Sequence, residues 1–204
     1  MDQKQNIING EFKNFINSMM EQNIINGVIN SMIEFQKQNN IKEQCITNSQ
    51  YLYDVIKKTF PHANVKAKAV CVISDDERIF EHNKRQIRAE KTVIGGHVVL
   101  FYNDVMIDSS YEISCLKAKS YFDNIKELMN NTKMNDDTKK FTISNHLKCM
   151  KFAEEINNGK LVITSKEYYN NLADYMDNIQ MRIFTDALDG LGVECVDLKK
   201  KRNY

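Results

Sequence analysis

Residues 95–112 read GGHVVLFYNDVMIDSSYE and constrain the fold more than any other part of the chain. Two strand-like runs, HVVLFY and VMIDSS, flank Asn103 and Asp104, two residue types that tolerate the positive φ angles of a tight turn. A loop of two residues pairs Tyr102 with Val105 across the turn. The sequence therefore predicts an antiparallel β-hairpin at this point.

The register of this hairpin decides where two polar side chains lie. Counting outward from the turn places Val99 opposite Asp108 and His97 opposite Ser110. Because side chains alternate along a strand, His97 and Asp108 share one face of the hairpin as diagonal neighbours. A carboxylate at that position can accept a hydrogen bond from an imidazole N–H and orient the ring as a base. A loop of three residues would reverse the alternation and separate the pair.

A different interpretation of the same pair involves no chemistry. His97 would then be a hydrogen-bonded core histidine, and Asp108 would cap the following turn, where Ser109, Ser110 and Tyr111 offer local partners. The hairpin alone leaves both interpretations open.

A second feature is a helix signal directly after Cys45. Thr47 and Gln50 form a capping-box pattern, and an apolar stripe of Leu52, Val55, Ile56 and Phe60 follows it. The pattern predicts a helix that begins just after Cys45. The N–H groups and macrodipole of a first helical turn favour negative charge, which lowers a thiol's pKa and makes it a better nucleophile. Alternatively, Cys45 is a small apolar filler of the core.

The five cysteines are scattered and lack CxxC spacing, so neither a disulfide framework nor a zinc ribbon is expected. Cys71, Cys149 and Cys195 fall in apolar or terminal contexts, and we assign them to packing. His146 and Cys149 share a helical face, but a metal site there would need two further ligands that the sequence does not identify. We therefore expect no metal and no cofactor.

A cysteine at a helix start, then a histidine strand and an aspartate strand, resembles the transglutaminase-like branch of the papain-like superfamily. The resemblance spans roughly Ile41 to Ser114, and GHVVLFYNDVMIDSSYE looks like that family's His-to-Asp hairpin. The aromatic residue often found shortly after the histidine is missing, which implies a different substrate groove. The resemblance implies a central helix packed on an antiparallel sheet, with Cys45 as nucleophile, His97 as base and Asp108 as the orienting acid.

An oxyanion hole in such a site would use the Cys45 N–H and a nearby side-chain amide. The candidates for that amide are Gln44, Asn40 and Asn39.

The remaining pattern predicts an α+β fold in a single domain, residues 1–204, without a flexible linker. Residues 1–40 form an N-terminal helical segment, residues 41–114 a catalytic-like core, and residues 115–204 a mainly helical part. Apolar periodicity predicts two core-facing helical stretches before Cys45, at 7–20 and 24–35. The other expected elements are a strand at 65–74, an exposed charged loop at 74–91, and helices at 120–131, 141–157 and from Thr164 or Ser165 onward.

The composition argues against nucleic acid and membranes as the main partners. The net charge is +1 and the sequence pI is about 7.6, so no global field favours nucleic acid. The N-terminus carries charges where a signal peptide needs an apolar core, and no apolar run reaches membrane-spanning length. We expect a soluble, cytoplasmic protein without membrane contact, while the terminal KKKRNY could contact phosphate or direct the chain to the nucleus.

These observations favour a cysteine-dependent acyl-transfer enzyme. The leading version is an intracellular thiol protease or amidase, a hydrolase that acts on a peptide, a protein or a small amide or ester through an acyl-enzyme intermediate. One alternative is a catalytically inactive papain-like scaffold that serves as a protein-interaction module. Another is an amine acyltransferase.

Overall fold

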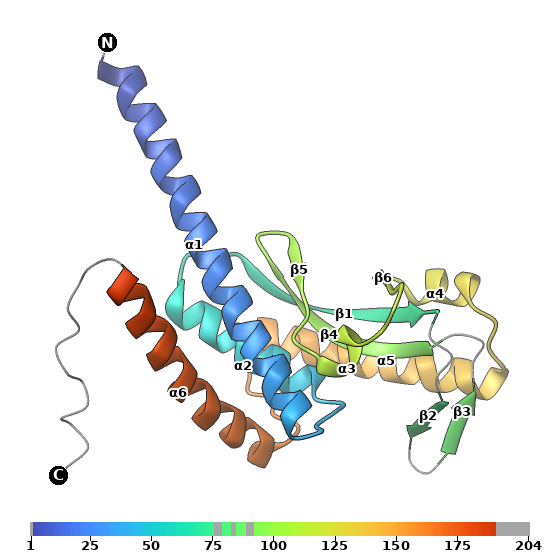
Figure 1. Cartoon of the computed structure of the whole chain (residues 1–204). Helices are drawn as coiled ribbons and strands as arrows, with labels where there is room; N and C mark the ends of the chain where they lie inside the picture. Colours follow the sequence, from blue (N-terminus) through green and yellow to red (C-terminus); the bar gives the residue numbers. More distant parts are fainter. Residues whose placement is uncertain (1, 76–78, 83–84, 89–91, 191–204) are drawn as a thin grey trace, which may run out of the picture.

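A computed structural model describes residues 2–75, 79–82, 85–88 and 92–190, with side chains left out at 2–19, 79–82, 85–88 and 180–190. The described chain is a mixed α/β fold, in which helices surround a four-stranded antiparallel sheet (Figure 1). In chain order the elements are α1 (Asp2–Gln38), α2 (Cys45–Thr59), β1 (Val65–Ser74), β2 (Ile79–His82), β3 (Arg85–Arg88), β4 (Thr92–Tyr102), β5 (Val105–Ile107), α3 (Tyr111–Ser114), β6 (Ser120–Phe122), α4 (Ile125–Asn131), α5 (Asp136–Asn157) and α6 (Lys166–Gly190).

The main sheet has the strand order β5-β4-β1-β6, and every neighbouring pair is antiparallel. The strand predicted at 65–74 is confirmed as β1, which pairs with β4 along its length. In contrast, β5 pairs only with Leu100, Phe101 and Tyr102 at the end of β4. On that side, the described chain leaves β4 without a strand partner from Thr92 to Val99.

The predicted hairpin is confirmed in its register as well as its position. Asn103 and Asp104 adopt φ angles of 47° and 65°, the left-handed values that a two-residue turn requires. Tyr102 therefore pairs with Val105, as counted from the sequence. This register brings His97, in the middle of β4, and Asp108, just after β5, together.

Two glycines let a helix lie directly on the backbone of β4. The β1–β4 register shifts where Gly95 and Gly96 stand opposite Cys71, as in a β-bulge. A Cβ added to Gly95 would overlap Thr142, and one added to Gly96 would lie 2.5 Å from the carbonyl oxygen of Asn145. Both positions belong to α5, so α5 occupies the space that the two missing Cβ atoms leave.

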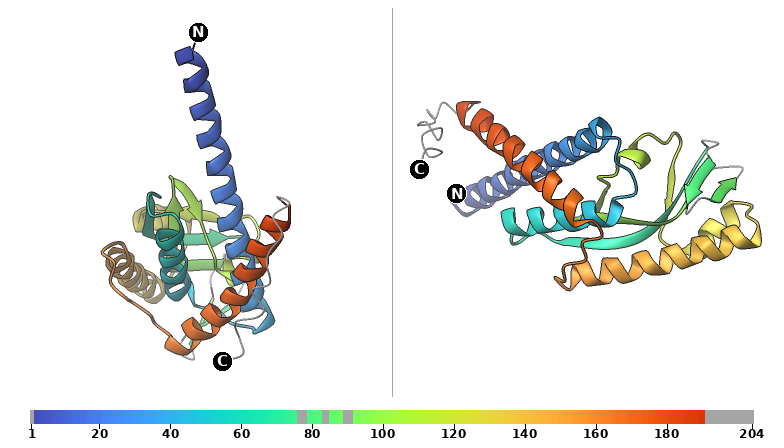
Figure 2. Two further views of the ribbon diagram at one scale, coloured as in Figure 1. Left: turned by 90° about the vertical axis from the view of Figure 1, so that its left-hand side faces the viewer. Right: turned by 90° about the horizontal axis from the view of Figure 1, so that it is seen from below.

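The two faces of the sheet have different coverings. Helices α2 and α5 pack on one face and form the larger core together with α1 and α6 (Figure 2). On the other face, Val70, Val72 and Val99 pack against Ile113 and Leu116 from α3 and the residue segment after it. Strand β6 and the long helix α5 both come from residues beyond Ser114. The sheet and the helix that covers it therefore include more of the chain than residues 41–114.

Several boundaries predicted from sequence are wrong. The N-terminal stretches form one continuous helix, α1, whose N-terminal half extends away from the rest of the described chain (Figure 1). Its later part is core-facing as predicted, with Ile25, Val28, Met32 and Phe35 buried. The charged loop expected at 74–91 contains the β2–β3 hairpin. The hairpin was missed because its strands have four residues each and only one apolar pair, Phe80 opposite Ile87, which leaves almost no periodic signal.

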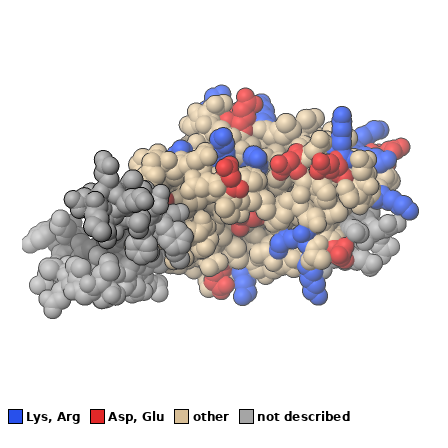
Figure 3. Space-filling model, turned by 90° about the horizontal axis from the view of Figure 1, so that it is seen from above, with Lys and Arg blue, Asp and Glu red and all other residues tan. Residues whose placement is uncertain are grey.

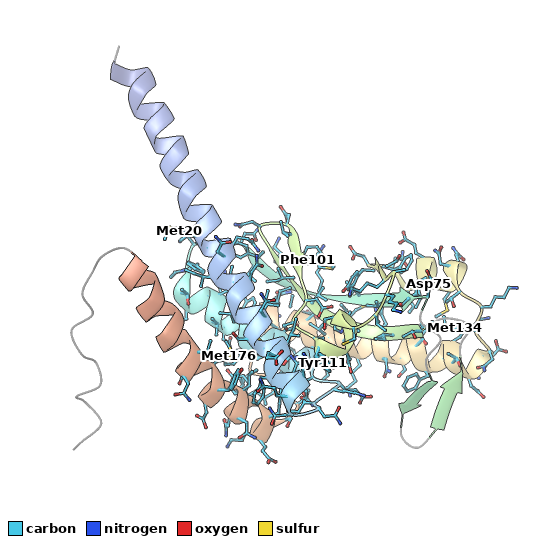
Figure 4. All side chains as sticks on the ribbon, in the orientation of Figure 1. Met20, Asp75, Phe101, Tyr111, Met134 and Met176 are labelled. Carbon is cyan, nitrogen blue, oxygen red and sulfur yellow. The ribbon has the colours of Figure 1, made fainter. Side chains whose placement is uncertain are left out.

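The C-terminal helices follow the prediction more closely. Helix α5 ends at Asn157 as predicted, Gly159 follows it at a φ of 69°, and Ser165 accepts a hydrogen bond from the Tyr168 N–H at the start of α6. Residues 120–122, predicted as helix, form β6 instead. Helix α6 packs on other helices and not on the sheet, with Met176 directed toward α1 (Figure 4).

Charged side chains are dispersed over the surface. Lys and Arg alternate with Asp and Glu on the face shown in Figure 3, as the net charge leads one to expect. None of the helices in the described ranges combines the length and apolar character of a membrane span. Cys195 and the KKKRNY tail lie outside the described residues.

A buried polar network joins three helices to the segment after β5. Gln36 of α1 donates to the Ser109 carbonyl at 2.7 Å and accepts hydrogen bonds from Asn48 at 3.0 Å and from the Tyr111 N–H at 3.2 Å. Tyr111 lies beside the C-terminal end of α1 (Figure 4). Asn48 of α2 in turn accepts the Tyr168 hydroxyl of α6 at 2.6 Å. The network therefore fixes the segment that carries Asp108 relative to α2.

We expect Asn48→Ala to lower the free energy of unfolding by about 2–3 kcal/mol, because it removes the hydrogen bonds to both Gln36 and Tyr168 and leaves the buried Tyr168 hydroxyl without its partner. The matched variant Tyr168→Phe removes one hydrogen bond from the network and should cost about 1 kcal/mol. Urea denaturation followed by circular dichroism measures both values. Equal losses for the two variants would contradict the role of Asn48 as the connecting residue.

Candidate functional site

A pocket of about 280 Å³ opens where β4, α2, α3 and α5 meet. Cys45 and His97 both line it, together with Glu112 of α3 and Cys149 of α5. The stretch of β4 from Val93 to His97 forms one wall, at the edge that β5 leaves uncovered. The pocket thus places two of the three residues predicted for chemistry on one surface.

The third predicted residue, Asp108, lies behind His97. Its Oδ2 is 2.8 Å from His97 Nε2, and the His97 side chain is only 1% exposed. Asp108 also accepts the Ser110 N–H at 3.0 Å and the Tyr121 hydroxyl at 3.1 Å. The diagonal pairing predicted from hairpin register is thereby confirmed as a direct hydrogen bond.

The two partners shift each other's ionisation. Burial opposes charge on His97, but the attraction and hydrogen bond of Asp108, with a smaller contribution from Cys45, hold the pKa of His97 well above its ordinary value. Burial likewise opposes charge on Asp108, yet His97, the Ser110 N–H and Tyr121 lower the pKa of its carboxyl group. The pair therefore favours an imidazolium beside a carboxylate.

The other ring nitrogen of His97, Nδ1, is the one available to Cys45. Nδ1 is buried and has no protein partner with hydrogen-bond geometry. Because Nε2 is held by Asp108, the interaction between His97 and the Cys45 thiol falls to the Nδ1 side of the ring. In the neutral form of the ring, an Nε2–H donated to Asp108 leaves the Nδ1 lone pair free to accept a proton from that thiol.

Cys45 is the first residue of α2 and is partly exposed. The capping-box prediction was wrong by three residues: Gln44 is the N-cap, and Thr47 lies buried inside the helix, bonded at 2.6 Å to Thr164. Gln44 makes no side-chain cap, so side chains do not cap the first-turn N–H groups beside Cys45. Ser49 anchors this end of α2 to β4 by donating to the Val98 carbonyl at 2.9 Å.

A second cysteine, which we had assigned to packing, contacts the predicted nucleophile. A hydrogen bond between Cys149 and Cys45 is the main cause that raises the pKa of Cys45 well above its ordinary value; burial adds to it, and His97 opposes it. The same hydrogen bond lowers the pKa of Cys149. In this arrangement Cys45 stays a protonated thiol. Its hydrogen bond with Cys149 favours the thiol form, whereas His97 favours the thiolate.

The side-chain amides proposed for an oxyanion hole lie outside the pocket lining. Asn39 donates to the Phe35 carbonyl at 2.8 Å, and Gln44 donates to the Lys42 carbonyl at 3.3 Å. Asn40 has a φ of 50° and forms part of the turn after α1. The pocket contains instead Asn145 of α5, which sequence spacing could not connect to Cys45.

The remaining cysteine and histidine near the pocket form a structural contact. Cys71 Sγ lies 3.3 Å from both the Gly95 carbonyl oxygen and His146 Nδ1, and all of these atoms are buried. Burial raises the pKa of Cys71 and lowers that of His146, which keeps both groups neutral. Neither lines the pocket. His146 and Cys149 therefore contact different groups, although they share one helix.

Comparisons of this chain with protein-family models, with curated proteins and with solved structures give no match.

We expect the imidazole of His97 to stay protonated above pH 6.5, its ordinary pKa. A raised folded pKa contributes stability that is complete below 6.5 and is lost as pH rises through the folded value. Asp108 contributes stability that is present above pH 3.8, its ordinary pKa, and is lost as the pH falls through its lowered pKa in the folded protein. NMR titration of the ring nitrogens measures the His97 pKa directly.

In Asp108→Asn, the largest influence that raises the pKa of His97 is lost, while burial and the smaller effect of Cys45 remain, so the pKa of His97 should fall. Asp123→Asn is the matched control, because Asp123 pairs with Lys68 on the surface. A His97 pKa that is the same in both variants would contradict the assigned cause.

We expect Cys149→Ala to lower the pKa of Cys45 by removing the group that raises it most. A lower pKa puts more of Cys45 in the thiolate form at neutral pH, roughly tenfold more for each pKa unit, so iodoacetamide should alkylate Cys45 faster than in the unchanged protein. Peptide mass spectrometry measures the rate. Cys149→Ser keeps a hydrogen-bonding group and should give a smaller increase. Slower alkylation in the alanine variant would contradict this account.

Proposed function

We propose that this protein is a cysteine-dependent acyl-transfer enzyme in which Cys45 is the nucleophile, His97 the general base and Asp108 the positioning residue. The observation that supports it most is the placement of His97 between two partners, with Nε2 on Asp108 and the Nδ1 side toward Cys45. This order of thiol, imidazole and carboxylate is what activation of a thiol by a base requires. The resemblance to the transglutaminase-like branch of the papain-like superfamily rests on the same three residues.

The proposed reaction begins from the neutral form of His97, which takes the Cys45 proton on Nδ1. The thiolate then attacks the carbonyl carbon of an amide or ester, and the imidazolium returns the proton to the departing amine or alcohol. A thioester remains on Cys45. Water, deprotonated by His97, attacks the thioester, releases the acid and restores the thiol, so the net reaction is hydrolysis.

Charge on the carbonyl oxygen needs donors during both steps. The backbone N–H of Cys45 belongs to the uncapped first turn of α2, where the helix dipole also favours negative charge. The amide of Asn145 lines the same pocket and is the side-chain donor that we propose in place of Gln44, Asn40 and Asn39.

A catalytically inactive interaction module is the second candidate. It is favoured by the raised pKa of Cys45 and by an exposed apolar row on α5. Ile143, Leu147 and Met150 in that row are 40%, 59% and 51% exposed at helical spacing. In this case Cys45 and His97 would be remnants of the scaffold, and removal of His97 would leave Cys45 reactivity unchanged.

We expect His97→Ala to slow alkylation of Cys45 by iodoacetamide at pH 7.5 by about 100-fold, the usual contribution of a positioned base. Cys115 is exposed and lies outside the pocket lining, so its rate in the same molecules is the internal reference. Peptide mass spectrometry gives both rates from one digest. An unchanged Cys45-to-Cys115 ratio would exclude the enzyme and favour the interaction module.

Hydrolysis and transfer to an amine share the acyl-enzyme step. With a chromogenic acyl ester as substrate, an added primary amine would divert the product to an amide in a transferase, whereas a hydrolase would still release the acid.

A further inference from the structure

Two thiols share the pocket. Of the cysteines in the described ranges, Cys45 and Cys149 are the two that line it, and their side chains are hydrogen-bonded to each other. Cys45 begins α2, whereas Cys149 lies on α5, more than a hundred positions further along the chain. The contact between them is therefore made by the tertiary fold, and the acyl-transfer steps proposed above do not use Cys149.

Both helices that carry these thiols are fixed on the same strand. Ser49 attaches the start of α2 to β4 by its hydrogen bond to a strand carbonyl. On α5, the backbone of Asn145 lies directly against Gly96 of β4, and Cys149 stands one helical turn after Asn145. The packing of α2 and α5 on β4 thus holds the two sulfurs together. Thiols that are already in contact need only small side-chain rotations to reach the geometry of a disulfide.

The other described cysteines have different surroundings. Cys71 Sγ lies 3.3 Å from both the Gly95 carbonyl oxygen and His146 Nδ1, and Cys71 does not line the pocket. Burial raises the pKa of Cys71 to about 12, which disfavours its thiolate. Cys115 is exposed and also lies outside the pocket lining. The geometry therefore singles out Cys45 and Cys149 as a pair.

The pocket gives a small reagent access to this pair. Cys45 is partly exposed, and the cavity of about 280 Å³ borders both residues. The hydrogen bond with Cys45 lowers the pKa of Cys149; burial opposes this effect and Lys148 adds to it. The thiolate is the form of cysteine that reacts with peroxides. Cys149 is accordingly the sulfur that ionises first.

We propose that Cys45 and Cys149 form a reversible disulfide when the protein meets a hydroperoxide, and that this bond removes the thiol of Cys45 from the pocket. The Cys149 thiolate attacks one oxygen of the peroxide, the O–O bond breaks, and a sulfenic acid forms on Cys149. The departing alkoxide takes up the proton that Cys149 had lost. Cys45 then attacks the Cys149 sulfur and loses its proton to the displaced hydroxide, which leaves as water. The two thiols are oxidised by two electrons, and the peroxide is reduced to water and an alcohol.

The disulfide would act as a switch on the pocket. In the oxidised protein Cys45 has no free sulfur, and exchange with a reducing thiol restores it. This inference goes beyond the proposed function and does not depend on it, because the disulfide needs the two sulfurs and a peroxide but no acyl substrate. A Cys45 reactivity that is independent of His97 would overturn the proposed enzyme and leave the disulfide standing.

Peptide mapping of the full chain tests the proposal. The reduced protein is treated with hydrogen peroxide, the remaining thiols are blocked with N-ethylmaleimide, and the unreduced digest is analysed by mass spectrometry. We expect one linked pair of peptides, which contain Cys45 and Cys149, and loss of Cys45 labelling that dithiothreitol reverses. The absence of this pair, or a link from Cys45 to a different cysteine, would overturn the proposal.

An equal mixture of isotope-labelled and unlabelled protein shows whether the link lies within one chain. Linked peptides should come from a single chain, because the two sulfurs touch within the fold. Linked pairs that combine a labelled and an unlabelled peptide would overturn the proposal. Cys115→Ser, which removes an exposed thiol outside the pocket lining, is the matched control and should leave the link unchanged.

Dimedone, which traps sulfenic acids, tests the order of the two steps. In Cys45→Ser the sulfenic acid on Cys149 lacks its partner sulfur, so the yield of the dimedone adduct at Cys149 should rise above that of the unchanged protein. The reverse variant, Cys149→Ser, should form no adduct at position 149 and no link to Cys45. An equal adduct yield at Cys149 in Cys45→Ser and in the unchanged protein would overturn the proposal, because Cys45 would then not consume the sulfenic acid.

Discussion

The hydrogen bond between His97 and Asp108 is the interaction on which the site depends. It places an imidazole that is 1% exposed against a carboxylate, and each group favours the charged form of the other. A buried charge without a partner would be strongly destabilising, so the surrounding structure must hold both groups in place. Tyr121 from β6 and the Ser110 N–H fix Asp108, and Gln36 of α1 fixes the adjoining Ser109. Segments far apart in the sequence thus converge on one carboxylate.

The position of this pair was predictable because it depends on local rules. Asn103 and Asp104 accept left-handed φ angles, a two-residue turn sets the register, and strand alternation then decides which side chains meet. The position of Cys45 at a helix start was predictable for a similar reason, since an apolar stripe follows it at helical spacing. The capping residues were misassigned because Thr47 satisfies its hydroxyl with Thr164, more than a hundred positions along the chain.

The rest of the site was not predictable, because it depends on how α5 approaches the sheet. Gly95 and Gly96 indicate that another group packs closely against the backbone of β4. The sequence does not determine whether that group is a substrate or a helix. The helix fills it, and it brings Cys149 and Asn145 into the pocket. No spacing in the sequence relates either residue to Cys45. The side-chain amides nearest to Cys45 in sequence, by contrast, lie outside the pocket lining.

The approach of α5 also changes how the thiol is controlled. A helix N-terminus and an adjacent imidazole favour the thiolate of Cys45, whereas the Cys149 hydrogen bond and burial favour its thiol form, and the second pair prevails in the free protein. Cys45, Cys149 and His97 all line one pocket, so the two influences on the Cys45 proton act on the same surface. The reactivity of Cys45 is therefore set by the balance between Cys149 of α5 and His97 of β4, and a change at either residue should shift it.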